Sequence, residues 1–165
     1  NSHGITKLEI NGRVVGEIAC VAVLCAHYAA PTLLVSGDES ACREARAFLP
    51  GVDTVATKRG VNRYSSIDCS PLNVREALTT GAQRAAQRYA EGGSGPLPTG
   101  FEAPFQMTVH LMCPNLADAA EQTGGERIDY LTVRYEAESF VELLARRSGY
   151  APGVFREAAS TDGNP

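Results

Sequence analysis

Residues 10–19 read Ile-Asn-Gly-Arg-Val-Val-Gly-Glu-Ile-Ala and join three kinds of local structure in one short stretch. The preceding residues, 5–10, alternate apolar and polar side chains, which is the period of a half-buried strand. Asn11-Gly12 predicts a two-residue hairpin, because both central residues of a type I′ turn need a positive φ. From Gly16 onward the apolar residues recur at spacings of three and four, which predicts a helix.

Glu17 therefore stands at the beginning of a predicted helix that ends before Pro31. One interpretation is electrostatic, because an acid in the first helical turn meets the positive end of the helix dipole. The other interpretation is a metal ligand, since a carboxylate fixed at a helix start can bind a cation. A single carboxylate is not a complete site, because catalytic zinc takes about three protein ligands and an open position.

A second acid follows the next predicted strand. Residues 32–36 are largely apolar, which is typical of a strand in a parallel sheet covered by helices, and Gly37-Asp38 comes directly after them. Functional loops in open α/β sheets lie at the carboxyl ends of such strands, so Asp38 is a candidate that faces a site. A helix N-cap is the alternative for Asp38.

The rest of the chain continues to alternate between strands and helices. Further helices are expected over 40–49, 70–89, 115–122 and 137–147, and further strands over 52–58, 105–112 and 128–135. This order predicts an α/β fold with a layered mixed sheet, flanked by helices and opened by the Asn-Gly hairpin. We expect one domain over 1–150, with a possible break at the loop 92–103, and a frayed tail over 151–165.

The composition excludes several classes of protein. The chain has 165 residues, 44% hydrophobic and 21% charged, with a net charge of −4, so a binder of nucleic-acid backbones is not expected. No apolar run approaches the roughly 18 residues that cross a bilayer. Five cysteines without a Cys-x-x-Cys pair indicate reduced, buried thiols in a cytoplasmic protein. The three histidines show no paired spacing, and we expect structural roles for them.

Several segments, taken in order, resemble one known family. The matching stretches are Ile-Asn-Gly-Arg-Val-Val-Gly-Glu-Ile over 10–18, Leu-Leu-Val-Ser-Gly-Asp over 33–38, Leu-Pro-Gly-Val over 49–52, Thr-Val-Ala-Thr-Lys over 54–58, Val-Asn-Arg over 61–63 and Arg-Ile-Asp over 127–129. This order is similar to that of the DppA-type D-aminopeptidases, zinc metallopeptidases that release an N-terminal D-amino acid from short peptides. The resemblance extends to about Gly149.

The resemblance implies a site with two zinc ions per subunit, of which Glu17 is one ligand. The other ligands, from an Asp-x-Glu pair and two histidines, and the catalytic histidine are expected before Asn1. The chain is thus interpreted as the C-terminal portion of a longer protein, a truncated domain without a catalytic residue of its own and inactive by itself. The whole protein is expected to be a cytoplasmic homo-oligomer that acts on short peptides containing D-amino acids.

Two other functions remain open from the residues. One is a non-catalytic α/β binding module, and the other is a related metal-dependent amidase with a different substrate. An Asp-x-Glu pair, two histidines and a His-Thr pair in the sequence upstream of Asn1 would favour the peptidase.

Overall fold

The computed structural model describes residues 4–62, 64–93 and 95–150. The chain divides into two compact units: unit 1 holds the described residues before Gly16 and after Gly100, and unit 2 runs from Gly16 to Gly100. Both units combine strands with helices, so the predicted α/β class is confirmed, and the strands divide into two sheets. His3 and the predicted frayed tail lie outside the described residues.

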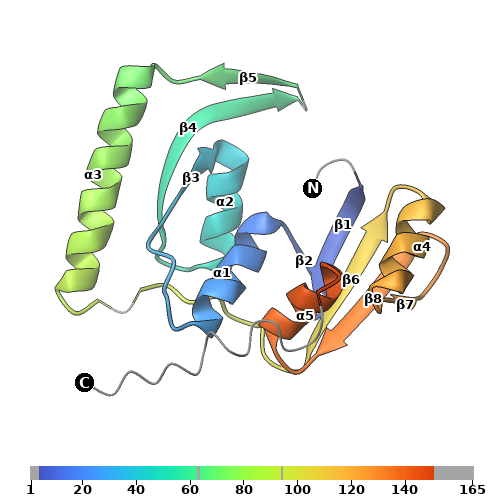
Figure 1. Ribbon diagram of the computed structural model, residues 1–165. Helices are drawn as coiled ribbons and strands as arrows, with labels where there is room; N and C mark the ends of the chain where they lie inside the picture. The colour runs from blue at the N-terminus through green and yellow to red at the C-terminus, as the bar shows by residue number, and fades with distance from the viewer. Residues whose placement is uncertain (1–3, 63, 94, 151–165) are drawn as a thin grey trace. The chain divides into compact units, whose positions relative to one another are not determined.

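Unit 1 is a five-stranded antiparallel sheet in the order β2-β1-β6-β8-β7 (Figure 1). Helices α4 and α5 pack on the face that carries the buried side chains of β6 and β8. The elements are β1 (Ile5–Ile10), β2 (Arg13–Val15), β6 (Phe105–Leu111), α4 (Pro114–Gln122), β7 (Glu126–Arg127), β8 (Thr132–Ala137) and α5 (Phe140–Arg147).

The predicted Asn-Gly hairpin joins β1 to β2. Asn11 and Gly12 have φ values of 49° and 76°, as a type I′ turn requires, and Ile10 pairs with Arg13 across the turn. The Asn11 side chain accepts the Gln106 N–H at 2.8 Å and donates to the Glu102 carbonyl at 2.7 Å. The hairpin tip is therefore tied to the beginning of β6.

The core of unit 1 follows the period of its strands. Met107, Val109 and Leu111 alternate on one face of β6 and are buried, while the residues between them are half-buried. Phe140 of α5 is fully buried and meets the Phe105 ring edge-on, with 5.4 Å between ring centroids.

Unit 2 has a three-stranded mixed sheet in the order β3-β4-β5, with β3 parallel and β5 antiparallel to β4. Figure 1 shows β3 and the first half of β4 between the helices α2 and α3. The elements are α1 (Glu17–His27), β3 (Leu34–Asp38), α2 (Glu39–Phe48), β4 (Asp53–Asn62), β5 (Ser65–Asp68) and α3 (Pro71–Ala90).

The packing of unit 2 relies on small side chains and one buried acid. Ala22 of α1 meets Ala45, Leu49 and Val52 in its central cluster. Asp53, at the beginning of β4, is buried and pairs with Arg84 at 2.7 Å and with Arg88 at 2.8 Å, which ties α3 to the sheet.

Three expectations about strands need correction. The strand expected over 128–135 begins at Thr132, because the Asp129 side chain accepts the Leu131 N–H at 2.8 Å and closes a turn. The strand expected over 52–58 runs to Asn62 and pairs with β5, which was not predicted. The apolar strand β3, expected to be buried on both faces, lies at the sheet edge of the described residues and is half-buried or exposed.

Two further observations concern the exposure of the cysteines and the apolar character of the helices. Cys69 and Cys113 are exposed, so the expectation of buried thiols is wrong for these two residues, although all five cysteines are free. Within the described residues, none of the helices combines the length and apolar character that a bilayer crossing requires.

Candidate functional site

Glu17 is the first residue of α1, directly after the hairpin, and its side chain is exposed. Its position in the first helical turn is the one predicted from the sequence. The N-cap is Gly16, which has no side chain to accept a hydrogen bond from the helix. Gly16 and the first turn of α1 thus place Glu17 at the exposed N-terminal end of that helix.

Glu44 of α2 binds the backbone of Gly16, the N-cap residue itself. Its Oε1 accepts the Gly16 N–H at 3.0 Å. A Cβ at position 16 would lie 2.5 Å from that oxygen, so a larger residue would displace the Glu44 carboxylate. Sequence reasoning missed this role, because no local pattern marks a contact between residues 28 positions apart.

Glu17 also lines a pocket between α1 and strand β3 with the residues just before it. The pocket has a volume of about 350 Å³, and among the described residues that line it only Glu17 is charged. The lining residues are Glu17, Ile18, Val21, Ala22, Thr32, Leu34, Val35 and Ser36. A carboxylate beside an apolar pocket can bind a cation or an amine while the pocket holds an apolar group.

Asp38 ends β3 and caps α2. Its Oδ1 accepts the Ala41 N–H at 2.8 Å, as expected for a helix N-cap. The N-cap role thus accounts for one of the two carboxylate oxygens. The Oδ2 of Asp38 faces β4, because a Cβ added to Gly60 of that strand would lie 3.4 Å from this oxygen. Among the described residues, Asp38 is not part of the lining of the Glu17 pocket.

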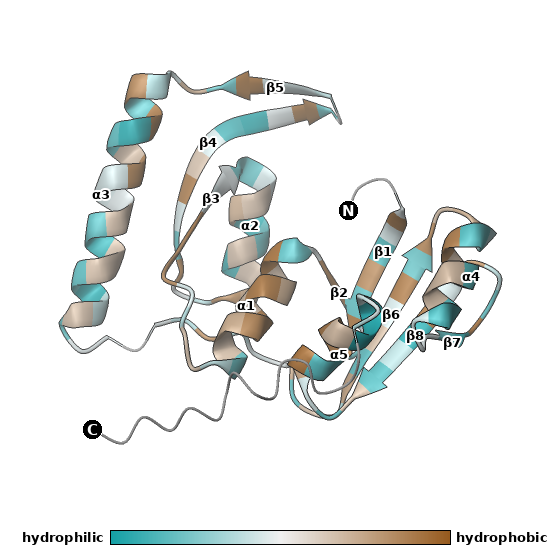
Figure 2. Ribbon diagram, viewed as in Figure 1, coloured by the Kyte–Doolittle hydropathy of each residue, from teal (hydrophilic) through white to brown (hydrophobic). Residues whose placement is uncertain are grey.

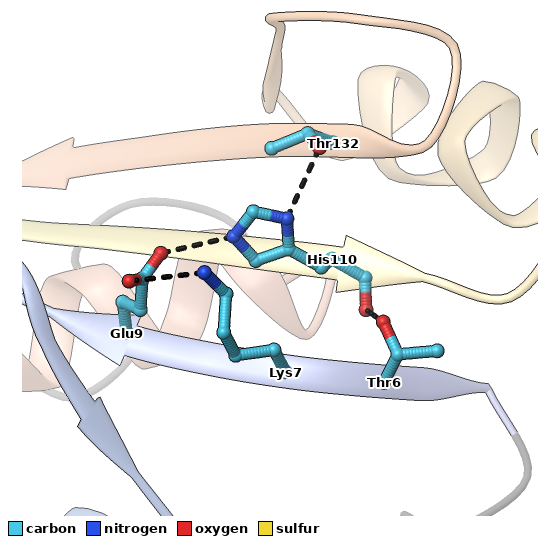
Figure 3. A network of polar contacts seen from close by, with 5 residues as sticks. All are labelled: Thr6, Lys7, Glu9, His110 and Thr132. Carbon is cyan, nitrogen blue, oxygen red and sulfur yellow. Dashed lines mark hydrogen bonds and ion pairs between the residues drawn. The ribbon is translucent and has the colours of Figure 1, made fainter.

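His110 of β6 lies at the centre of a polar network on unit 1 (Figure 3). Its Nε2 is 2.9 Å from Oε2 of Glu9 on β1, and its Nδ1 is 3.2 Å from Oγ1 of Thr132 on β8. Lys7 Nζ reaches the other Glu9 oxygen at 3.2 Å. Both ring nitrogens have partners on neighbouring strands, so His110 joins three strands, in keeping with the structural role expected for it.

The same network lowers the pKa of two carboxyl groups. The hydrogen bond from His110, followed by that from Lys7, lowers the pKa of Glu9 below its ordinary value of 4.5. The Leu131 N–H and the Thr132 hydroxyl lower the pKa of Asp129 below 3.8. Both shifts favour the charged form of these carboxyl groups.

The described residues contain no group of three or more His, Cys, Asp or Glu side chains that could hold a metal ion. Glu17 fits one position of a zinc site, because a carboxylate oxygen is an ordinary zinc ligand. The described residues alone do not supply the remaining ligands that such a site requires.

Comparisons with known proteins agree on one family. The model of the Peptidase M55 family, described as D-aminopeptidase, matches residues 1–147. A D-aminopeptidase of Bacillus subtilis (strain 168) is 38% identical over 77 residues, which is 46% of this chain and 28% of that protein.

A solved structure agrees with this. It is described as the Zn-dependent D-aminopeptidase DppA from Bacillus subtilis, a self-compartmentalizing protease, and it superposes with a TM-score of 0.76 at 26% identity. The superposition covers 88% of this chain and 52% of that one, so the chain spans about half the length of the solved relative.

Proposed function

The chain belongs to the D-aminopeptidase family, and we propose that the whole protein is a zinc-dependent aminopeptidase that releases N-terminal D-amino acids from short peptides. The family match over residues 1–147 carries this proposal. The superposition with a Zn-dependent D-aminopeptidase supports zinc as the metal.

Glu17 is proposed as one ligand of a site that holds two zinc ions per subunit. The other ligands and the catalytic histidine come from parts of the whole protein outside the described residues. Zinc supplies a Lewis acid that polarises a peptide carbonyl and activates water. The Glu44 hydrogen bond to Gly16 ties the beginning of α1, where Glu17 lies, to α2. Asp38 remains a weaker candidate for a residue near the site.

The pocket beside Glu17 is proposed to receive a small apolar side chain of the peptide. Its lining by Ile18, Val21 and Leu34 favours an apolar group, and Glu17 stands beside it. In this proposal, the apolar side chain of the peptide binds next to the proposed metal ligand Glu17.

Two further observations support proposals about the assembly and the location. The solved relative is described as self-compartmentalizing, which supports a homo-oligomer for this protein. All five cysteines are free, which suits a reducing compartment, and we place the protein in the cytoplasm.

The test is hydrolysis by the whole protein. Purified protein is incubated with D-alanyl and L-alanyl dipeptides, and the released amino acid is measured before and after removal of metal by a chelator. We expect release from the D-substrate, loss of activity on chelation and recovery with added zinc. Equal activity on both substrates would contradict the stereospecificity, and activity that survives full metal removal would contradict the zinc dependence.

A further inference from the structure

The second half of β4 and all of β5 form a ribbon, residues 58–68, which we call the β4–β5 arm. Every described residue of the arm is exposed, on both faces of the ribbon. Strand β5 packs on β4, and among the described residues no other helix or strand packs extensively against it. A two-stranded ribbon with both faces in water is at best marginally stable.

The arm carries apolar side chains that water does not favour. Val61 is 61% exposed and Ile67 is 55% exposed, and Leu72 follows just beyond the arm at 70%. Figure 2 shows apolar segments on both strands of the arm. Strand β5 is also an edge of its sheet among the described residues, and such an edge presents backbone groups to a partner. Exposed apolar side chains on a ribbon with an open edge favour an interaction surface.

The charge of the arm indicates what kind of surface it fits. Lys58, Arg59 and Arg63 outnumber the single acid, Asp68, whereas the whole chain has a net charge of −4. The arm is therefore basic and the rest of the chain is acidic. A basic arm is attracted to the acidic remainder of another copy, while two arms repel each other.

We propose that the β4–β5 arm docks on a neighbouring copy of the same chain and holds the assembled protein together. This inference rests on the homo-oligomer of the proposed function, and it names the surface that forms it. Because the arm of one copy meets a different surface of the next, the contact is heterologous. The apolar side chains supply buried area, and the basic side chains select the acidic partner.

The test is the mass of the whole protein in solution, measured by sedimentation over a range of concentrations. The variant carries Val61→Ser and Ile67→Ser, and the control carries Val14→Ser and Leu97→Ser, which are 59% and 53% exposed outside the arm. We expect wild type and control to form the same oligomer. The arm variant should dissociate at least about tenfold more readily, with an unchanged far-ultraviolet spectrum.

A second variant tests the charge of the arm. Lys58→Glu with Arg59→Glu should also shift the protein toward the dissociated form. Added salt should promote dissociation of the wild-type oligomer and should change the mass of this variant less. An arm variant that keeps the wild-type mass would overturn the proposal. So would a monomeric wild-type protein, including one whose arm is protected from hydrogen exchange by another part of its own chain.

Zinc content and release of D-alanine, measured on the same samples, separate this proposal from the proposed function. If the oligomer forms but zinc-dependent hydrolysis is absent, the proposed function is refuted and the proposal about the arm still stands. If the protein hydrolyses the D-substrate but the arm variants leave the mass of the oligomer unchanged, only the proposal about the arm is refuted.

Discussion

The two units use their apolar residues differently. Unit 1 buries large side chains such as Ile10, Met107 and Phe140 against a sheet whose other face is polar. Unit 2 builds its central cluster around Ala22, Ala45, Leu49 and Val52, and leaves other apolar side chains exposed on α1 and the β4–β5 arm. Unit 1 is therefore held together by large buried side chains, whereas the central cluster of unit 2 consists mainly of small ones.

Helix α1 shows the contrast most clearly. Figure 2 draws most of this helix as apolar, although Val21 is 57% exposed and lines the pocket beside Glu17. Helix α5, by contrast, buries Phe140, Val141, Leu143 and Ala145 and carries Arg146 and Arg147 in its last turn. A helix that is apolar on several sides is expected to be covered on more than one of them.

The largest predicted effect belongs to the core of unit 1. Phe140→Ala should lower the free energy of unfolding by about 3–5 kcal/mol, because it empties a fully buried site beside Phe105. Urea unfolding followed by far-ultraviolet circular dichroism measures this, since the chain has no tryptophan. Val14→Ala, at a residue 59% exposed in the same unit, is the control and should change the free energy little. Similar losses for both variants would contradict the description of unit 1 as held together by large buried side chains.

A smaller effect is expected at the beginning of unit 2. Gly16→Ala should cost about 1–2 kcal/mol, because its Cβ displaces the Glu44 carboxylate and the hydrogen bond to the residue 16 N–H is lost. Glu44→Ala removes the same hydrogen bond, so the double variant should lose much less than the sum of the two single losses. Urea unfolding of the three variants gives the coupling, and strictly additive losses would show that the two residues act independently.

The smallest effect concerns the pH dependence of unit 1. The pKa of Glu9 is lowered in the folded protein, so its contribution to stability is present above its ordinary value of 4.5. This contribution is lost as the pH falls through the lowered value. Between pH 5 and pH 3, Glu9→Gln should therefore lose less stability than wild type, as measured by thermal unfolding at a series of pH values. Glu138→Gln, at an exposed acid of the same unit, is the control, and a Glu9→Gln profile that matches it and wild type would contradict the role of the network.

Local patterns in the sequence were enough to predict the hairpin and the helix that follows it. Positive φ at Asn11 and Gly12 is a property of those two residues, and the position of Glu17 follows from the change of period at Gly16. Ile128 to Leu131 show where local patterns mislead, because they alternate like a strand while the Asp129 side chain closes a turn.

The parts that were missed depend on contacts between distant residues. Strand β5 has two serines and an aspartate, and it forms a strand because β4 provides backbone partners. Glu44 reaches Gly16 from another helix, and the pocket beside Glu17 joins α1 to a segment that follows it. The resemblance indicated Glu17 as a ligand, whereas the pocket could be described only from the fold.

Zinc content of the whole protein tests most directly whether Glu17 is a metal ligand. Glu17→Gln is compared with Glu39→Gln, because both replace an exposed glutamate in the first turn of a helix and remove the same charge from the helix dipole. Elemental analysis of protein purified without added metal should show less zinc for Glu17→Gln, and wild-type zinc for Glu39→Gln. Activity should fall together with the zinc. Equal zinc in all three proteins would contradict the assignment of Glu17 as a ligand.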